Sequence, residues 1–177
     1  MIKKKKLFVT IALSLLIIFA SGNNVLANPL SVDEYQSNFS CWCACASQIC
    51  GYFENYSTEQ DYYNCEGAIF YYYGGQVNGN IDWIEGGVQY ITDINGSVQY
   101  NPLSWTAVKY QINNDCPIAA ALGDYYGSQH AITIRGYKTE NFINYCYYVD
   151  PYDGLYHLRA YNYLVNSWDW ANSAFWA

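Results

Sequence analysis

Apolar residues between positions 41 and 114 recur every three or four positions, which is the period of a helix. In the first segment, residues 41–53, they are Cys41, Ala44, Cys45, Ile49 and Tyr52. Ser40 precedes this segment as a cap, whereas Gly51 weakens the pattern near its end. The pattern therefore predicts a helix that begins at Cys41.

Two further helices are predicted before residue 92. One starts at a capping box, with Ser57 as the cap and Gln60 three residues later, and it ends at the glycine pair 74–75. The other covers residues 81–91 and has a poorer pattern, because the glycine pair 86–87 interrupts it.

Ser104 caps a fourth predicted helix that ends near residue 114, after which the period changes. Short apolar or alternating runs then predict strands at residues 117–122, 130–137, 143–149 and 155–161. Residues 150–154 read Asp-Pro-Tyr-Asp-Gly and predict the turn between the last two strands. Helices followed by an antiparallel sheet give an α+β fold.

The first 27 residues are predicted to be a signal peptide rather than part of the fold. Lysines 3–6 precede an apolar stretch, and Val25, Leu26 and Ala27 provide the small residues of a cleavage site. Cleavage after Ala27 leaves residues 28–177, one domain of ordinary size with no internal repeat or linker. We expect a secreted protein that does not stay inserted in the membrane.

The charge of this domain limits its partners. Four basic residues stand against 15 acidic ones, a formal net charge of about −11. This balance argues against nucleic acid and against an anionic membrane surface. It is compatible with cationic substrates, but solubility alone would also explain it. The 21 tyrosines suit either a tyrosine-rich core or a surface that binds peptide or glycan.

Seven cysteines leave one thiol over if the others pair. In an exported chain we expect disulfides, and the predicted elements allow Cys45 or Cys50 with Cys65, and Cys116 with Cys146. A zinc site at Cys41, Cys43 and Cys45 is disfavoured, since side chains at i, i+2 and i+4 on one helix do not converge. No metal or other cofactor is expected.

Cys41 is the candidate nucleophile. At a helix start the unpaired N–H groups and the dipole favour a thiolate. The rival cysteines, Cys43, Cys45 and Cys50, lie further along the helix and lack this stabilisation. Gln36, on the segment that leads into the helix, is the candidate for an oxyanion hole together with the Cys41 N–H. Gln48 and Gln129 are its rivals: the former lies within the helix, the latter beside the candidate base.

His130 is the candidate base, at the start of a predicted strand and after a loop that leaves room for substrate. In a hairpin of residues 130–137 and 143–150, Asp150 lies directly opposite His130 and orients its ring. The second histidine, His157, is expected to be structural, and Asp153 to serve the turn.

These motifs together resemble the papain-like cysteine peptidases, most closely a compact, secreted bacterial branch. The resemblance rests on Gln36 five residues before Cys41-Trp42, on the His130-Ala131 run that ends in Gly-Tyr, and on Asp150-Pro151. It covers nearly all of residues 28–177 and departs from the family pattern at Cys43, where a small residue is usual. It implies a two-lobed fold, with N-terminal helices packed against the sheet.

The resemblance also implies hydrolysis of a protein or peptide substrate through a thioester acyl-enzyme, with Cys41, His130, Asp150 and Gln36 as the catalytic residues. Two other functions stay open. The same acyl-enzyme serves a transpeptidase or an isopeptide-forming enzyme if an amine releases it. A tyrosine-rich binding or adhesin-like module with this fold requires no turnover.

Overall fold

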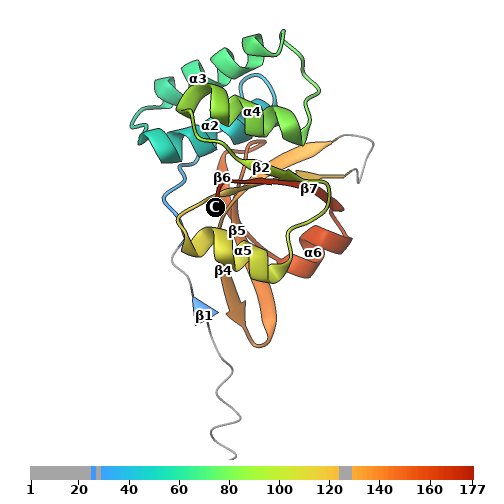
Figure 1. Ribbon diagram of the computed structural model, residues 1–177. Coiled ribbons are helices and arrows are strands. Elements are labelled where there is room, and N and C mark those ends of the chain that lie inside the picture. The colour runs from blue at the N-terminus through green and yellow to red at the C-terminus, as the bar shows by residue number, and fades with distance from the viewer. Residues whose placement is uncertain (1–24, 27–28, 124–128) are drawn as a thin grey trace, which may run out of the picture.

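The computed structural model describes residues 25–26, 29–123 and 129–177, so the predicted leader as far as residue 24 and the predicted cleavage site at Ala27 lie outside them. Three helices form one half of the molecule and an antiparallel sheet the other (Figure 1). The helices are α2 (Cys41–Glu54), α3 (Glu59–Tyr72), α4 (Ile81–Thr92), α5 (Trp105–Asn113) and α6 (Tyr161–Asn166). The strands are β1 (Val25–Leu26), β2 (Ser97–Gln99), β3 (Ile118–Leu122), β4 (His130–Glu140), β5 (Ile143–Asp150), β6 (Leu155–Ala160) and β7 (Trp170–Phe175). The α+β, papain-like arrangement is confirmed.

The helix starts follow from their caps. Ser40 precedes α2 with an extended backbone, as predicted. The capping box of α3 lies one residue later than predicted: Thr58, not Ser57, is the cap, and its partner is Asp61, not Gln60. The two side chains form reciprocal hydrogen bonds: the Asp61 carboxylate accepts one from the Thr58 N–H at 3.0 Å, and the Thr58 hydroxyl accepts one from the Asp61 N–H.

Glycines inside the helices are points of close packing rather than interruptions. The predicted break in α4 at residues 86–87 is absent, and the helix is continuous through them. A Cβ on Gly87 would lie 2.8 Å from Ile69 of α3, and one on Gly51 of α2 would lie 2.1 Å from the Tyr62 ring. The missing side chains therefore let α2, α3 and α4 approach one another.

The two faces of the sheet carry side chains of different size. Ala119, Ala131 and Ala174 belong to the core shared with α2, α3 and α4. Ile118 and Ile132, their neighbours in sequence, point to the opposite face, whose core includes residues of α5 and α6. Small residues on the first face let α2 lie directly on the sheet, which places the start of α2 beside β4.

The strand order is β2-β7-β3-β4-β5-β6, with β1 pairing to the far end of β4 (Figure 1). The predicted register of β4 and β5 is wrong by two residues: Thr133 pairs with Val149, so Asp150 does not lie directly opposite His130. Within this pair of strands the register also changes by one residue between Ile134 and Gly136. A two-residue error keeps the side chains on the same face, so His130 and Asp150 still meet diagonally.

The last predicted strand ends one residue early, at Ala160, and α6 begins at the next residue. Four elements have no counterpart in the sequence prediction: β1, which lies within the predicted signal peptide, β2, α6 and β7. β7 returns from the end of the chain to pair with both β3 and β2, which inserts it between segments distant in sequence.

All seven cysteines lie within the described residues, and each is a free thiol. The expected pair Cys116–Cys146 is wrong, because β4 lies between β3 and the strand of Cys146, and two strand spacings exceed the reach of a disulfide. The expected pair of Cys65 with Cys45 or Cys50 is likewise not formed, and the Cys45 sulfur accepts a hydrogen bond from the Thr133 hydroxyl.

Gly51→Ala is expected to lower the free energy of unfolding by about 1–3 kcal/mol, although alanine is the better helix former. The Tyr62 ring cannot withdraw easily, since it stacks on Tyr35 at 5.3 Å and its hydroxyl donates to Asp33 at 2.8 Å. Gly67→Ala in α3 is the matched control: its Cβ would meet Phe39 at an ordinary 3.5 Å, so it should stabilise the protein by up to about 1 kcal/mol. Urea unfolding of both variants measures the difference, and equal effects would contradict the packing explanation.

Candidate active site

Cys41 is the first residue of α2, and the local sequence leaves the positive end of that helix open. The Ser40 side chain makes no capping hydrogen bond to the helix, and the first turn contains no acidic residue. Cys41 is partly exposed, whereas Cys43, Cys45 and Cys50 on the same helix are fully buried. The dipole and the unpaired N–H groups therefore act on the one thiol of α2 that solvent and substrate reach.

The rival cysteines on α2 are held as thiols by burial. Burial raises the pKa of Cys43 to about 12, and burial likewise raises the pKa of Cys45 to about 12. The pKa of Cys50 is raised well above its usual value, again mainly by burial. These three side chains fill the core and are unsuited to nucleophilic attack.

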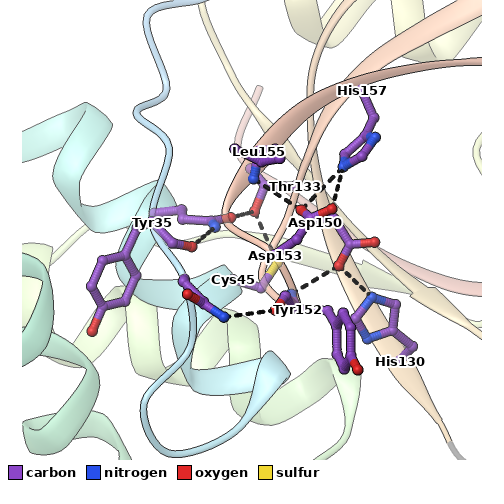
Figure 2. A network of polar contacts seen from close by, with 11 residues as sticks. Tyr35, Cys45, His130, Thr133, Asp150, Tyr152, Asp153, Leu155 and His157 are labelled. Carbon is purple, nitrogen blue, oxygen red and sulfur yellow. Dashed lines mark hydrogen bonds and ion pairs between the residues drawn. The ribbon is translucent and has the colours of Figure 1, made fainter.

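His130 and Asp150 form the closest ionic contact of the site. The His130 Nε2 atom lies 2.7 Å from Asp150 Oδ1, and the same oxygen accepts from the Tyr152 N–H at 2.9 Å (Figure 2). Burial disfavours the proton on His130, but hydrogen bonds with Asp150 and with Cys41 outweigh it and raise the pKa of His130 to about 10. Because Nε2 is engaged with Asp150, Nδ1 is the ring nitrogen left for Cys41.

The structure places Gln36 next to Asp150 rather than on the wall of the cleft at Cys41. Its side-chain amide donates to the Tyr152 carbonyl oxygen at 3.1 Å, in the turn after Asp150. The oxyanion role of Gln36 stays a prediction. Of its rivals, Gln48 is buried and donates to the Tyr35 carbonyl oxygen at 2.8 Å, and Gln129 lines the cleft beside His130.

His157 and Asp153 form a separate pair that does not line the cleft. The His157 Nε2 atom lies 3.0 Å from an Asp153 oxygen, and its ring stacks on Tyr148. Asp153 also accepts from the Leu155 N–H at 2.9 Å, which fixes the turn between β5 and β6 (Figure 2). Both residues thus have the structural roles that the sequence favoured.

Glu66 of α3 holds the segment that leads into Cys41, and sequence reasoning missed it. This fully buried carboxylate accepts from the Tyr35 hydroxyl at 2.7 Å, the Ser37 hydroxyl at 3.0 Å and the Phe39 N–H at 3.0 Å. It also accepts from the N–H groups of Asn38 and Ser40. Its helix carries two other acidic residues in the first turn, so only the helical spacing of Glu66 with buried Tyr62 and Ile69 could have identified it.

A cleft with a volume of about 460 Å³ opens at Cys41 and His130. Its walls come from the start of α2, the segment before α4 with the first turn of α4, and the ends of β3, β4 and β7. The lining residues are Cys41, Trp42, Val77, Asn78, Gly79, Asn80, Ile81, Asp82, Ile84, Tyr100, Ala121, Gln129, His130, Ala131 and Asn172. A substrate chain in this cleft contacts the thiol and the imidazole together.

Residues 23–166 match a protein family described as papain-like cysteine protease AvrRpt2, and this range contains Cys41, His130 and Asp150. No curated protein sequence matches the chain. Over the described ranges, no cluster of three or more His, Cys, Asp or Glu side chains is arranged to bind a metal ion. Within the same ranges, no helix has both the length and the apolar character to cross a membrane.

Glu66→Gln is expected to lower the free energy of unfolding by about 1–3 kcal/mol, because an amide nitrogen then faces the donors of the lead segment and leaves one unpaired. Cys41 should also react more slowly with a small alkylating agent, since the start of α2 is no longer fixed. The matched control is Glu59→Gln, an exposed acid on the same helix, which should change stability by about 0.5 kcal/mol at most. Thermal unfolding and the rate of Cys41 alkylation are measured for both variants. Equal values for Glu66→Gln and Glu59→Gln would refute the role of Glu66.

Proposed function

Because the chain belongs to the AvrRpt2 family of papain-like cysteine proteases, we propose that it is a secreted peptidase that cleaves peptide bonds with Cys41, His130 and Asp150 as its triad. One observation carries this assignment. His130 stands between a carboxylate at 2.7 Å and the Cys41 thiol, and both partners favour the protonated ring. A histidine in this setting supports a thiolate and later supplies a proton to a leaving amine.

The reaction follows from these positions. The Cys41 thiolate attacks the carbonyl carbon of the scissile bond, and the electron pair of the C=O bond moves to the oxygen. When that oxyanion collapses, the C–N bond breaks, His130 gives its proton to the amine, and a thioester remains on Cys41. Neutral His130 then takes a proton from water, the hydroxide adds to the thioester, and release of the acid restores the thiolate and the imidazolium.

Two further groups support the transition state in this proposal. The Cys41 N–H, at the open end of α2, is one donor to the oxyanion, and the Gln36 amide is the other. Gln36 reaches the cleft only if its amide turns from the Tyr152 carbonyl oxygen, to which it now donates. Asp150 is a positioning residue: it touches no substrate atom and acts by holding the His130 ring.

Export completes the proposal: residues 1–27 are the leader, and the peptidase acts on proteins or peptides outside the cell. Free thiols are compatible with this location. Only Cys41 takes part in the proposed chemistry, and four of the other six cysteines are buried on α2 and α3.

Limiting iodoacetamide should alkylate one fast site in the folded protein, Cys41, and His130→Ala should slow this reaction at least tenfold, since it removes the group that stabilises the thiolate. His157→Ala is the matched control, and it should leave the rate within about twofold, because His157 pairs with Asp153 instead. Peptide mapping by mass spectrometry locates the label.

A mixed peptide library then tests turnover. The wild type should cleave it and Cys41→Ala should not. A fast label on a different cysteine would refute the assignment of the nucleophile. A reactive Cys41 without any turnover would indicate a binding module, and ligation of added amines would indicate a transpeptidase.

Asp150→Asn should lower kcat/KM about 100-fold or more and move the alkaline limit of activity to lower pH. The sign follows from His130: its pKa is raised to about 10, so the imidazolium persists until the pH rises through that value, and loss of the Asp150 charge lets it deprotonate earlier. The pH dependence of kcat/KM measures the shift. Asp153→Asn, which alters the other His–Asp pair, should keep the wild-type limit, and an unmoved limit in Asp150→Asn would contradict the role of Asp150.

A further inference from the structure

The described part of the active-site cleft carries an uneven set of charges. Asp82 is the one carboxylate among its lining residues, and no lysine or arginine is among them. Asp82 is exposed, and two other exposed residues of the same cleft, Val77 and Tyr100, add an aliphatic side chain and an aromatic ring. A side chain that enters here meets an apolar surface and a negative charge.

Asp82 is held in place by a second residue of the cleft lining. The Tyr100 hydroxyl donates to Asp82 Oδ1 at 2.7 Å. This hydrogen bond raises the pKa of Tyr100, so the phenol keeps its proton and stays a donor. Among the described residues, Asp82 Oδ2 accepts no hydrogen bond and forms no ion pair. One oxygen of this cleft-lining carboxylate is held by Tyr100, and the other is left for a ligand.

Asp82 also lies in the first turn of α4, where a carboxylate stabilises the helix through its dipole. That role requires neither Tyr100 nor a position on the cleft wall. A helix-stabilising acid changes the stability of the protein, whereas a binding group changes the choice of substrate, so the two roles are separable by measurement.

We propose that this part of the cleft receives an arginine or lysine side chain of the substrate, with its methylenes against Val77 and the Tyr100 ring and its charge on Asp82. This inference rests on the proposed peptidase function and adds its substrate class. Long basic side chains combine an apolar stem with a charged end, which is the combination that these walls offer. The net charge of the chain, −7 over all its residues, also attracts cationic substrates and repels acidic ones.

The test uses pairs of tripeptidyl chloromethyl ketones that differ at one position only, with arginine in one and norleucine in the other. Their rate of reaction at Cys41, followed by mass spectrometry, reports occupancy of the cleft without requiring turnover. At one of the three positions the wild type should react about fivefold faster with the arginine label, the ratio expected for one partly exposed ion pair. That ratio should fall as salt is raised.

Asp82→Asn should bring the ratio to about one, since the amide can still accept from Tyr100 but carries no charge. Asp82→Lys should favour a glutamate label at the same position. Glu140→Gln is the matched control: it removes one negative charge at the far end of β4, outside the cleft, and should keep the wild-type ratio.

A wild-type ratio near one at every position overturns the inference, and this result does not depend on the stability of any variant. An unchanged ratio in Asp82→Asn overturns it as well. Cleavage of the corresponding peptides is scored separately. Arginine preference in labelling without any cleavage refutes the peptidase and keeps the subsite, whereas cleavage without preference refutes the subsite and keeps the peptidase.

Discussion

The buried carboxylate of Glu66 is the contact on which the geometry of the site depends. A charge removed from water is costly unless donors surround it, and here the donors come almost entirely from one short segment, residues 35–40. Two of them are the N–H groups of Phe39 and Ser40, immediately before α2. The carboxylate therefore fixes the point at which the chain enters α2, and with it the position of Cys41.

The same segment also reaches the other half of the molecule. The Ser37 N–H donates to the Pro151 carbonyl oxygen at 2.8 Å, and Gln36 donates to that of Tyr152. Both acceptors belong to the turn that directly follows Asp150. Gln48 adds a third link, since it joins the Tyr35 carbonyl oxygen to Thr133 of β4 (Figure 2). The segment thus ties the helix that carries the thiol to the strands that carry the imidazole and the carboxylate.

The parts of this arrangement that the sequence predicts are those with local causes. Caps and apolar periods locate α2, α3 and the central strands to within a few residues, and a thiol at a helix start followed by a histidine on a strand singles out Cys41 and His130. The register of β4 on β5 escapes prediction because β4 extends to a tight turn at Asn141 and Phe142, both with positive φ, which the sequence analysis did not place there. Glu66 and β7 escape because their partners lie far away in sequence. The glycines at 51 and 87 read as helix breakers and act as packing surfaces, which tertiary contacts alone decide.

The charges around the cleft connect the chemistry to the choice of substrate. A His130 ring that keeps its proton to about pH 10 is a cation at neutral pH, and Asp150 at 2.7 Å balances it. In the proposed mechanism the Cys41 thiolate then adds a negative charge that no other cation of the described cleft offsets, and Asp82 adds a second. In this proposal the site is therefore already biased against acidic substrates. The hydrogen bond from Tyr100 places Asp82 where this bias becomes selective, because a fixed carboxylate on an apolar wall distinguishes a long cationic side chain from a neutral one of the same length.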